Sequence, residues 1–413
     1  MRRPSPVLPA LALALAACTG SGEVPSATPS SSPSATADTP AALATPTPPA
    51  PDPDPTTLLM WARGGLPPDV VARARALPDV VAVAHVRSDT LALVGSRDAD
   101  GRAVDDLDPG WQVPVEVSAV DPGAADLLAP GPARDAVAAL TPGEVLLTES
   151  SAAQRGLGPG AQVDLAGRAG LVVAAVVPDD ELGRDEVIVH VDDADALGME
   201  PEGSVRVLHE ADDATALASD LSALAPDDTA VRVVGAEDDA GAPQRAPLVL
   251  SLPEVKERFG EFAFRDDDAD REIRVEPAWI DEHIVLAEVP LLGRVRCHEA
   301  IVEDLRGALQ AVVDAGLGDT IDPDLYGGCY HARRIGDGPS LSRHSWGIAI
   351  DINVDISQPG LGPEPEPEVV EAFAAHGFRW GGLFLSPDNH HFEWVGDAAL
   401  DDPPERRVGD TAG

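Results

Sequence analysis

The chain has 413 residues, of which 71 are acidic and 29 are basic, so its formal net charge is -42. A surface this acidic repels phosphate backbones and anionic headgroups, which excludes nucleic acid as a partner held by charge. At this length a single hydrophobic core is not expected, and we predict two folded domains together with unfolded segments.

The N-terminus has the pattern of an export signal. Two arginines precede an apolar run over residues 7–17, which is too short to cross a bilayer as a helix of the mature protein. The run ends in Leu15-Ala16-Ala17-Cys18, which resembles a bacterial lipobox. The resemblance implies that residues 1–18 are a lipoprotein signal peptide, and that lipid on Cys18 anchors the protein outside the cytoplasm, on the bacterial cell membrane. In the alternative, a plain secretory signal, Cys18 is incidental.

Composition divides the rest of the chain into segments. Residues 19–56 are mostly Ser, Thr, Pro and Ala, so they cannot bury enough surface to offset the entropy of ordering, and we predict a disordered linker. Strand and helix patterns begin at residue 57, and tryptophans gather in the last third. Beyond the linker we predict an α+β accessory domain at 57–246, a connector at 247–275, a second folded domain at 276–398 and a polar tail at 399–413.

In the accessory domain, short apolar runs bounded by turn residues predict an α+β fold. Residues 80–86 and 91–95 are expected as two strands, with a turn at Ser88-Asp89 between them. In the connector, residues 248–252 are expected as a strand.

Two runs of the accessory domain, Leu140–Leu147 and Gly156–Gly167, resemble part of the extracytoplasmic domain of MacB/FtsX-type permeases. The resemblance implies a non-catalytic interaction or positioning module. A protein partner is therefore possible for residues 57–246.

If Cys18 carries lipid, two cysteines remain, Cys297 and Cys329. An even pair in an oxidising compartment predicts a disulfide. A thiolate zinc site is less well supported, because neither cysteine lies in a Cys-x-x-Cys pair.

The stretch from Ser342 to Asn353 places a histidine and an aspartate around a strand-like run. Ile348, Ile350 and Ile352 are expected on one face, and Asp351 on the other. An ionised aspartate in so apolar a strand is costly unless it is paired or binds a metal. His344 lies in the preceding loop, from which it can fold back toward Asp351.

A second cluster, His390 to Trp394, follows about forty residues later, and His391 and Glu393 share a face if it is a strand. Two histidines and one aspartate match the three protein ligands of a catalytic zinc, with a fourth position for water. The alternative for each motif is a set of hydrogen-bonded polar residues in a strand core. His390 is an alternative ligand to His391.

Three strings share the order of a known family: Ser342-x-His344-x-x-Gly347-x-Ala349-x-Asp351, Phe378-x-Trp380-Gly381-Gly382 and Asp388-x-x-His391-Phe392-Glu393. They resemble the zinc D-alanyl-D-alanine carboxypeptidases and L-alanyl-D-glutamate endopeptidases, which include the VanY-like enzymes. The resemblance spans about residues 276–396. It implies a C-terminal α+β domain of hedgehog/DD-peptidase fold, so that residues 276–398 would be a zinc peptidase domain.

The resemblance also implies a role for each matching residue. His344, Asp351 and His391 would bind Zn²⁺, Asp388 would be the general base, and Arg333 would hold a substrate carboxylate or polarise the scissile carbonyl. The side chains expected to hold these ligands in place are Glu393 and Ser342.

Several of these roles have competitors in the sequence. Glu393 is an alternative base, although on the face of His391 it is better placed to orient that ligand. His331 and the neighbouring Arg334 are alternatives to Arg333. The family has Asp-Trp soon after Trp-Gly-Gly, where this chain has Leu383-Phe384-Leu385, which leaves open which bond is cut.

The sequence thus predicts a zinc metallopeptidase acting on peptidoglycan stem peptides, like a D-Ala-D-Ala carboxypeptidase or an L-Ala-D-Glu endopeptidase. The choice among D,D-carboxypeptidase, L,D-carboxypeptidase and endopeptidase stays open. The alternative function is a non-catalytic lipoprotein that binds cell-wall peptide or regulates a partner.

Overall fold

The computed structural model contains both helices and strands, as predicted for an α+β protein. We call the described residues from 57 to 234 the N-terminal region and those from 249 to 396 the C-terminal region. The predicted signal peptide with Cys18, the linker at 19–56 and the tail at 399–413 lie outside the described residues. The structure describes residues 57–62, 66, 69–128, 131–179, 185–199, 203–210, 214–224, 231–234, 249–267, 271–336, 338–354, 363–384 and 387–396.

The N-terminal region is built on one mixed sheet, in the order β3-β7-β4-β6-β5-β2-β8-β1-β9. The pairs β3–β7 and β4–β6 are parallel, whereas the other pairs are antiparallel. The strands are β1 (Thr57–Ala62), β2 (Val80–Arg97), β3 (Val113–Val120), β4 (Glu144–Thr148), β5 (Gln162–Leu165), β6 (Arg168–Val177), β7 (Val187–His190), β8 (Ser204–His209) and β9 (Val231–Val234).

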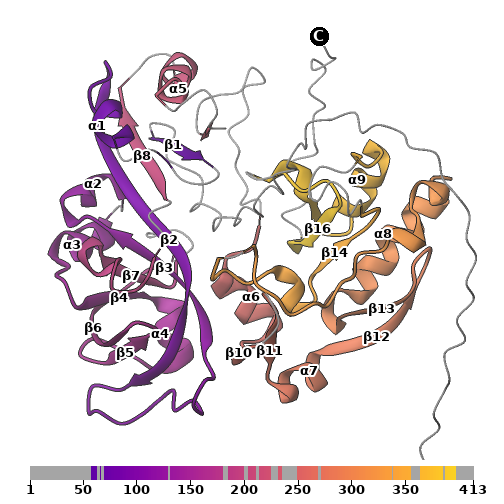
Figure 1. Cartoon of the computed structure of the whole chain (residues 1–413), viewed down its shortest axis with the longest axis horizontal. Helices are drawn as coiled ribbons and strands as arrows, with labels where there is room; N and C mark the ends of the chain where they lie inside the picture. Colours follow the sequence, from indigo (N-terminus) through magenta and orange to yellow (C-terminus); the bar gives the residue numbers. More distant parts are fainter. Residues whose placement is uncertain are drawn as a thin grey trace, which may run out of the picture. The chain divides into compact units, whose positions relative to one another are not determined.

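Strand β2 runs unbroken through the position where a turn was predicted, so the prediction at Ser88-Asp89 is wrong (Figure 1). Its first part pairs with β8, and its later part pairs with β3 and β5. The polar pair stays in the strand because the neighbouring strand and the local backbone provide hydrogen-bond partners for both side chains. Ser88 Oγ lies 2.5 Å from Ser118 Oγ on β3, and Asp89 Oδ1 accepts a hydrogen bond from the Thr90 amide.

Helices pack on this sheet through small apolar faces. In α5 the buried residues are Leu217 and Leu221, one turn apart, which is the spacing of an amphipathic helix. The helices are α1 (Val70–Ala74), α2 (Ala125–Leu128), α3 (Gly131–Ala139), α4 (Glu149–Arg155) and α5 (Ala214–Ser222), with 3₁₀ turns η1 (Pro122–Ala124) and η2 (Val191–Asp193).

The C-terminal region opens with a capped helix, α6 (Leu252–Phe259), rather than the strand predicted at 248–252. The prediction is wrong because Ser251 is the N-cap. Its hydroxyl accepts a hydrogen bond from the Glu254 amide, and the Glu254 side chain accepts one from the Ser251 amide. This reciprocal capping starts a helix where an apolar run suggested a strand.

The rest of this region surrounds one hydrophobic cluster that extends from Leu250 to Val395. Helix α8 lies along the β12–β13 hairpin and buries Leu305, Leu309 and Val312 (Figure 1). The elements are β10 (Phe264–Asp266), β11 (Ile273–Val275), α7 (Pro277–His283), β12 (Ile284–Val289), β13 (Gly293–His298), η3 (Glu299–Ile301), α8 (Val302–Asp314), η4 (Gly318–Thr320), η5 (Pro323–Leu325), η6 (Arg343–Trp346), β14 (Ala349–Asp351), α9 (Pro367–Ala374), β15 (Phe378–Trp380), η7 (Gly381–Leu383) and β16 (His391–Trp394).

The small sheet β14-β16-β15 brings the two predicted ligand strings together. Strands β14 and β16 are antiparallel, and their register places Asp351 opposite His391 and Ala349 opposite Glu393. Residues far apart in the chain thus become direct neighbours.

All described residues fall within one compact unit, so the predicted boundaries of the accessory domain and connector stay predictions. In the part of the chain that the structure describes, no helix has the length and apolar character needed to cross a membrane.

Candidate metal centre

The centre begins with a cross-strand pair. His391 Nδ1 lies 2.9 Å from Asp351 Oδ1, at a position where the two strands face each other directly. The predicted alternation is therefore present: Ile350 and Ile352 are buried in the core, and Asp351 turns to the other face.

His344 reaches the same place from the 3₁₀ turn η6. The turn is capped by Ser342, whose hydroxyl accepts a hydrogen bond from the His344 amide at 3.3 Å. It ends at Gly347 with φ +68°, a conformation that favours glycine, and a Cβ there would lie 2.8 Å from the His298 amide nitrogen. The sharp reversal lets the chain enter β14 directly after presenting the imidazole.

One nitrogen of His344 is engaged and the other faces the carboxylate. Nδ1 lies 2.7 Å from the carbonyl oxygen of Cys329, an acceptor, so Nδ1 carries the proton. Nε2 lies 3.2 Å from Asp351 Oδ2 and has no hydrogen-bond partner among the described residues, although it is buried. An imidazole nitrogen that carries no proton, and whose lone pair accepts no hydrogen bond, is the form that binds a metal.

His344, Asp351 and His391 each offer a ligand atom, and these atoms lie within 4.8 Å of one another. Among the described residues this is the group of histidine, cysteine and carboxylate side chains suited to holding a metal ion. Two imidazoles and one carboxylate suit zinc, and they leave a coordination position for water or substrate. The residues therefore fit the predicted metal.

The charges at the centre support one another. Burial disfavours the ionised form of Asp351, yet the adjacent His344 and His391 hold the pKa of this carboxyl well below its usual range. Burial also acts against the protonated form of His391, but hydrogen bonds to Asp351 and Glu393 raise the pKa of this imidazole to about 10. Asp351 is thus ionised and paired with a protonated His391, and a metal ion would bind here in exchange for that proton.

Glu393, for which a role in orienting His391 is predicted, lies beside that imidazole. Its Oε2 lies 3.6 Å from His391 Nε2, the ring nitrogen that does not face Asp351. On its other side, Glu393 Oε1 lies 3.4 Å from Arg343 Nε. Glu393 is buried between these groups, so it is poorly placed to reach a substrate.

Asp388 lies in the loop that enters β16 and is partly exposed. Its amide donates to the Gly381 carbonyl at 3.0 Å, and its own carbonyl accepts from the His391 amide at 3.3 Å. His390 Nε2 lies 3.2 Å from Asp388 Oδ1. His390 is not part of the ligand group, which contains His391, and it contacts the proposed base instead.

The loop carrying Arg333 is tied to the metal loop by its backbone. The Arg333 amide donates to Ser345 Oγ at 3.1 Å, and its carbonyl accepts from the Ser342 amide at 3.0 Å. Burial lowers the pKa of Arg333, and the charges of Asp351 and Asp388 oppose that effect. The backbone contacts thus place Arg333 beside the loop that carries His344, and the charges of Asp351 and Asp388 act on its guanidinium.

The two alternatives to Arg333 are occupied elsewhere. Arg334 bonds to Asp266 Oδ1 at 3.0 Å through Nε, and to the Pro339 carbonyl at 2.8 Å. His331 is half exposed and lies 3.7 Å from Glu272. Both side chains make contacts that hold the loop.

A disulfide joins Cys297 on β13 to Cys329, as predicted, with Cα atoms 5.3 Å apart. The adjacent amide of Tyr330 donates to the Arg296 carbonyl at 2.8 Å, which ties the same loop to β13 a second time. The Cys329 carbonyl that accepts from His344 is therefore held in place by a covalent link.

Three residues near the centre were not anticipated from the sequence. Arg343 contacts Glu393; Phe384 places its ring 5.8 Å from that of His391; and burial, together with the charge of Asp351, raises the pKa of Tyr326 to about 12. Arg343 could have been found from the sequence, because it is a charged residue between Ser342 and His344 in a motif that is otherwise expected to be buried.

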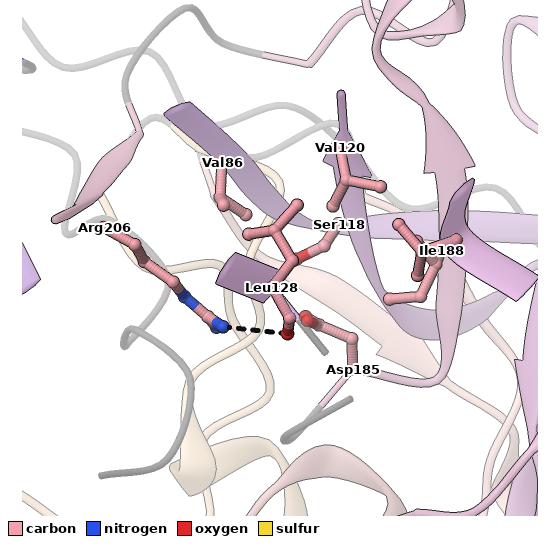
Figure 2. A pocket seen from close by; sticks show the side chains of 8 residues that line it. Val86, Ser118, Val120, Leu128, Asp185, Ile188 and Arg206 are labelled. Atoms are coloured by element: carbon pink, nitrogen blue, oxygen red, sulfur yellow. Dashed lines mark hydrogen bonds between the residues drawn. The ribbon is translucent and has the colours of Figure 1, made fainter. Parts of the chain in front are cut away.

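A separate small pocket lies in the N-terminal region (Figure 2). Arg206 donates to the Leu128 carbonyl at 3.4 Å; burial lowers the pKa of Arg206, and Asp185 opposes that shift. The pocket contains none of the predicted site residues. Its lining consists of Val86, Ser118, Val120, Leu128, Val137, Asp185, Ile188 and Arg206.

Comparison with known proteins places the metal centre within a family match. Residues 336–394 match the family model of D-alanyl-D-alanine carboxypeptidase, and this stretch contains the three ligand candidates and Asp388. The match indicates a peptidase. No curated protein matches the chain.

Two solved structures are weakly similar. The periplasmic region of MacB from Actinobacillus actinomycetemcomitans is 14% identical, with a TM-score of 0.32, over 43% of this chain and 88% of that chain. The extracellular domain of the noncanonic ABC-type transporter YknZ from Gram-positive bacteria is 12% identical, with a TM-score of 0.30, over 43% of this chain and 99% of that chain.

Proposed function

We propose that the protein is a zinc-dependent peptidase that hydrolyses peptide bonds in peptidoglycan stem peptides, as a D-Ala-D-Ala carboxypeptidase or an L-Ala-D-Glu endopeptidase. The observation that carries the proposal is the convergence of His344, Asp351 and His391, whose ligand atoms lie within 4.8 Å of one another. It lies inside the stretch matched by the D-alanyl-D-alanine carboxypeptidase family.

In this proposal His344, Asp351 and His391 hold Zn²⁺. A bound zinc ion would lower the pKa of a coordinated water to about 7 and polarise a peptide carbonyl as a Lewis acid. Asp388, which is partly exposed, takes the proton of the attacking water and delivers it to the leaving amine. Arg333 binds a substrate carboxylate or the carbonyl oxygen as negative charge develops there.

Ser342 and Glu393 hold the ligands in position. Ser342 caps the turn that carries His344, and Glu393 contacts the ring nitrogen of His391 that does not face Asp351. Such contacts fix the tautomer and orientation of a ligating imidazole. The Cys297–Cys329 disulfide holds the loop whose carbonyl performs the same task for His344.

We further propose that the protein acts outside the cytoplasm, where stem peptides occur, and that lipid on Cys18 anchors it to the membrane. The disulfide supports this location, because such bonds persist in oxidising compartments. In this arrangement residues 19–56 are the linker, residues 57–246 an accessory domain with a possible protein partner, and residues 276–398 the peptidase domain of hedgehog/DD-peptidase type.

The proposal is tested by metal analysis together with digestion. Purified protein should contain zinc, and peptidoglycan treated with it should release fragments whose masses identify the bond that is cut. The variants His344→Ala and Asp351→Ala should lose both zinc and activity. Full activity in either variant would refute the site.

The alternative, a domain that binds cell-wall peptide without cleaving it, gives a different result in the same experiment. Wild-type protein would then carry no zinc and release no fragment, yet would bind stem peptide. The presence of Leu383-Phe384 where the family has Asp-Trp motivates this comparison, because Phe384 lies beside His391.

A further inference from the structure

A line of largely buried charged side chains leads from the metal ligand His391 into the N-terminal sheet. Glu393 lies 3.6 Å from His391 Nε2, and its other oxygen lies 3.4 Å from Arg343 Nε. Arg343 Nη2 in turn lies 3.8 Å from Oε1 of Glu116. The line therefore alternates acid and base, and it ends on a residue of strand β3.

Glu116 is held firmly at its end of the line. Its Oε2 accepts a hydrogen bond from the Leu252 amide at the start of α6, at 3.1 Å. Its backbone amide donates to Glu186 Oε1 at 3.2 Å, and its carbonyl accepts from the Glu186 amide. The residue is 7% exposed, so its side chain depends on polar partners within the protein.

A second cluster of buried charges fixes the same contact between β3 and α6. Lys256 of α6 donates to both carboxylate oxygens of Glu186 at 2.8 Å and lies 3.0 Å from Glu261. Arg155 bonds Glu261 in turn at 3.0 Å through Nη1. Ion pairs that are buried and also hydrogen-bonded are costly to break, so Glu116 has a defined position relative to Arg343.

Arg343 contacts two carboxylates, that of Glu393 beside the metal ligand His391 and that of Glu116 on β3. Its Nη2 donates to the Leu250 carbonyl at 2.8 Å, which leaves Nε toward Glu393. A planar guanidinium can serve several acceptors at once, which an ammonium group on a flexible stem cannot do. Without Glu116, Arg343 would pair more fully with Glu393 and draw it away from His391.

We infer that Glu116, although it belongs to the N-terminal sheet, is a positioning residue for the metal centre and acts through Arg343 and Glu393 on His391. The N-terminal region then supplies part of the framework that sets metal affinity. The inference rests on the proposed function insofar as His391 is a zinc ligand.

The test measures the zinc affinity of the purified full chain by competition with a chromogenic chelator. Glu393→Gln should weaken binding by about 10–100-fold, as outer contacts to metal ligands do, and Glu116→Gln should weaken it less, by up to about tenfold. Arg343→Lys keeps the positive charge but loses the planar guanidinium that serves several acceptors, so it should also weaken zinc binding. Because it alters no residue of the N-terminal sheet, it tests the link even if Glu116→Gln fails to fold.

The matched control is Glu261→Gln. It removes the same charge from the neighbouring cluster of ion pairs, in which Glu261 contacts Lys256 and Arg155 rather than Arg343. It should lower the unfolding midpoint and leave zinc affinity unchanged, because the Lys256–Glu186 pair, which holds the residue bonded to the Glu116 backbone, stays in place. In the double variant Glu116→Gln/Glu393→Gln, affinity should equal that of Glu393→Gln alone, because Glu116 acts through Glu393.

The outcomes separate the two proposals. If wild-type protein binds no zinc, the proposed function fails. If wild-type protein binds zinc but Glu116→Gln and Arg343→Lys match Glu261→Gln, or if the losses in the double variant simply add, then only the positioning role of Glu116 is overturned.

Discussion

His344 Nδ1 lies 2.7 Å from the carbonyl oxygen of Cys329, the residue whose sulfur is joined to Cys297. The contact fixes the His344 tautomer, so that Nε2 presents its lone pair toward Asp351. The Cys297–Cys329 disulfide, formed by two residues outside the ligand strings, thus helps to fix the tautomer of the ligand candidate His344.

Removing the disulfide should therefore affect both stability and metal affinity. The double variant Cys297→Ala/Cys329→Ala opens a loop of 32 residues in sequence separation, which should lower the free energy of unfolding by roughly 3–4 kcal/mol. Zinc affinity should fall as well, because the carbonyl that holds His344 is released. Chemical denaturation and chelator competition measure the two effects. Unchanged zinc affinity in a destabilised variant would show that the Cys329 carbonyl is not needed to hold the ligand.

Substitutions of Asp388 and Glu393, the two acidic residues near His391, should have different kinetic effects. Asp388→Asn should retain zinc and lower kcat by about 10²–10⁴-fold, the range of general acid–base catalysis. Glu393→Gln should weaken zinc binding, yet keep most of kcat once zinc is saturating, because Glu393 is buried behind the ligand. Steady-state kinetics across a zinc titration distinguish these outcomes. The opposite pattern would make Glu393 the base.

The neighbouring arginines should also differ. Arg333→Ala should lower kcat/KM by roughly 10²–10³-fold, as loss of a group that stabilises developing charge does. Arg334→Ala should mainly lower thermal stability, since Arg334 bonds Asp266 and the Pro339 carbonyl. Kinetics on a stem-peptide substrate and thermal unfolding of both variants check this. Equal kinetic losses would mean that the loop position, rather than the Arg333 guanidinium, matters.

The centre was predictable from the sequence to the extent that strand alternation controls it. His391 and Asp351 each stand on a short strand with a clear inner and outer face, so two local patterns were enough to name the pair. Ser88-Asp89 was predicted as a turn and Ser251 as part of a strand, and both predictions are wrong. Polar residues that mark turns also fit a paired strand or a helix N-cap, and only the partners decide.

The contact between Glu116 and Arg343 was not predictable. The two residues are far apart in the chain, and neither stands in a pattern that names its partner. Their pairing depends on how β3, η6 and the start of α6 meet, which local periodicity does not encode. The Trp-Gly-Gly string carried meaning only as part of a family resemblance, whereas the structure gives a physical reason for one of its glycines.

Gly381 should not tolerate a side chain. A Cβ at this position would lie 2.7 Å from the Asp388 carbonyl oxygen and 3.0 Å from His391 Cβ, so Gly381→Ala must displace the loop between base and ligand. Both kcat and zinc affinity should fall. Gly158→Ala is the control, because among the described residues nothing lies within 4 Å of the position that a Cβ would take there. Equal activity of the two variants would show that the Asp388 loop can shift without cost.

His298 should make stability depend on pH. Its Nδ1 accepts a hydrogen bond from the Ala300 amide at 3.1 Å, Nε2 faces the Phe259 carbonyl at 3.3 Å, and the ring stacks on His283. Burial lowers the pKa of His298 to about 4, while the Phe259 carbonyl opposes the shift and the charge of His283 adds to it. The neutral ring therefore satisfies both contacts, and protonation would remove the acceptor at Nδ1.

The sign follows from which state binds the proton. The unfolded histidine has a pKa of about 6.5, so the unfolded state takes up its proton first as the pH falls. The stability that this residue contributes is fully present above pH 6.5, and it is lost progressively as the pH falls toward about 4. Between pH 7 and pH 5 the loss from this residue should be on the order of 2 kcal/mol. His298→Asn keeps a capping acceptor without titrating, so it should flatten this part of the profile. Urea unfolding of both proteins at each pH, with a zinc chelator present, measures the difference; parallel profiles would exclude His298 as its source.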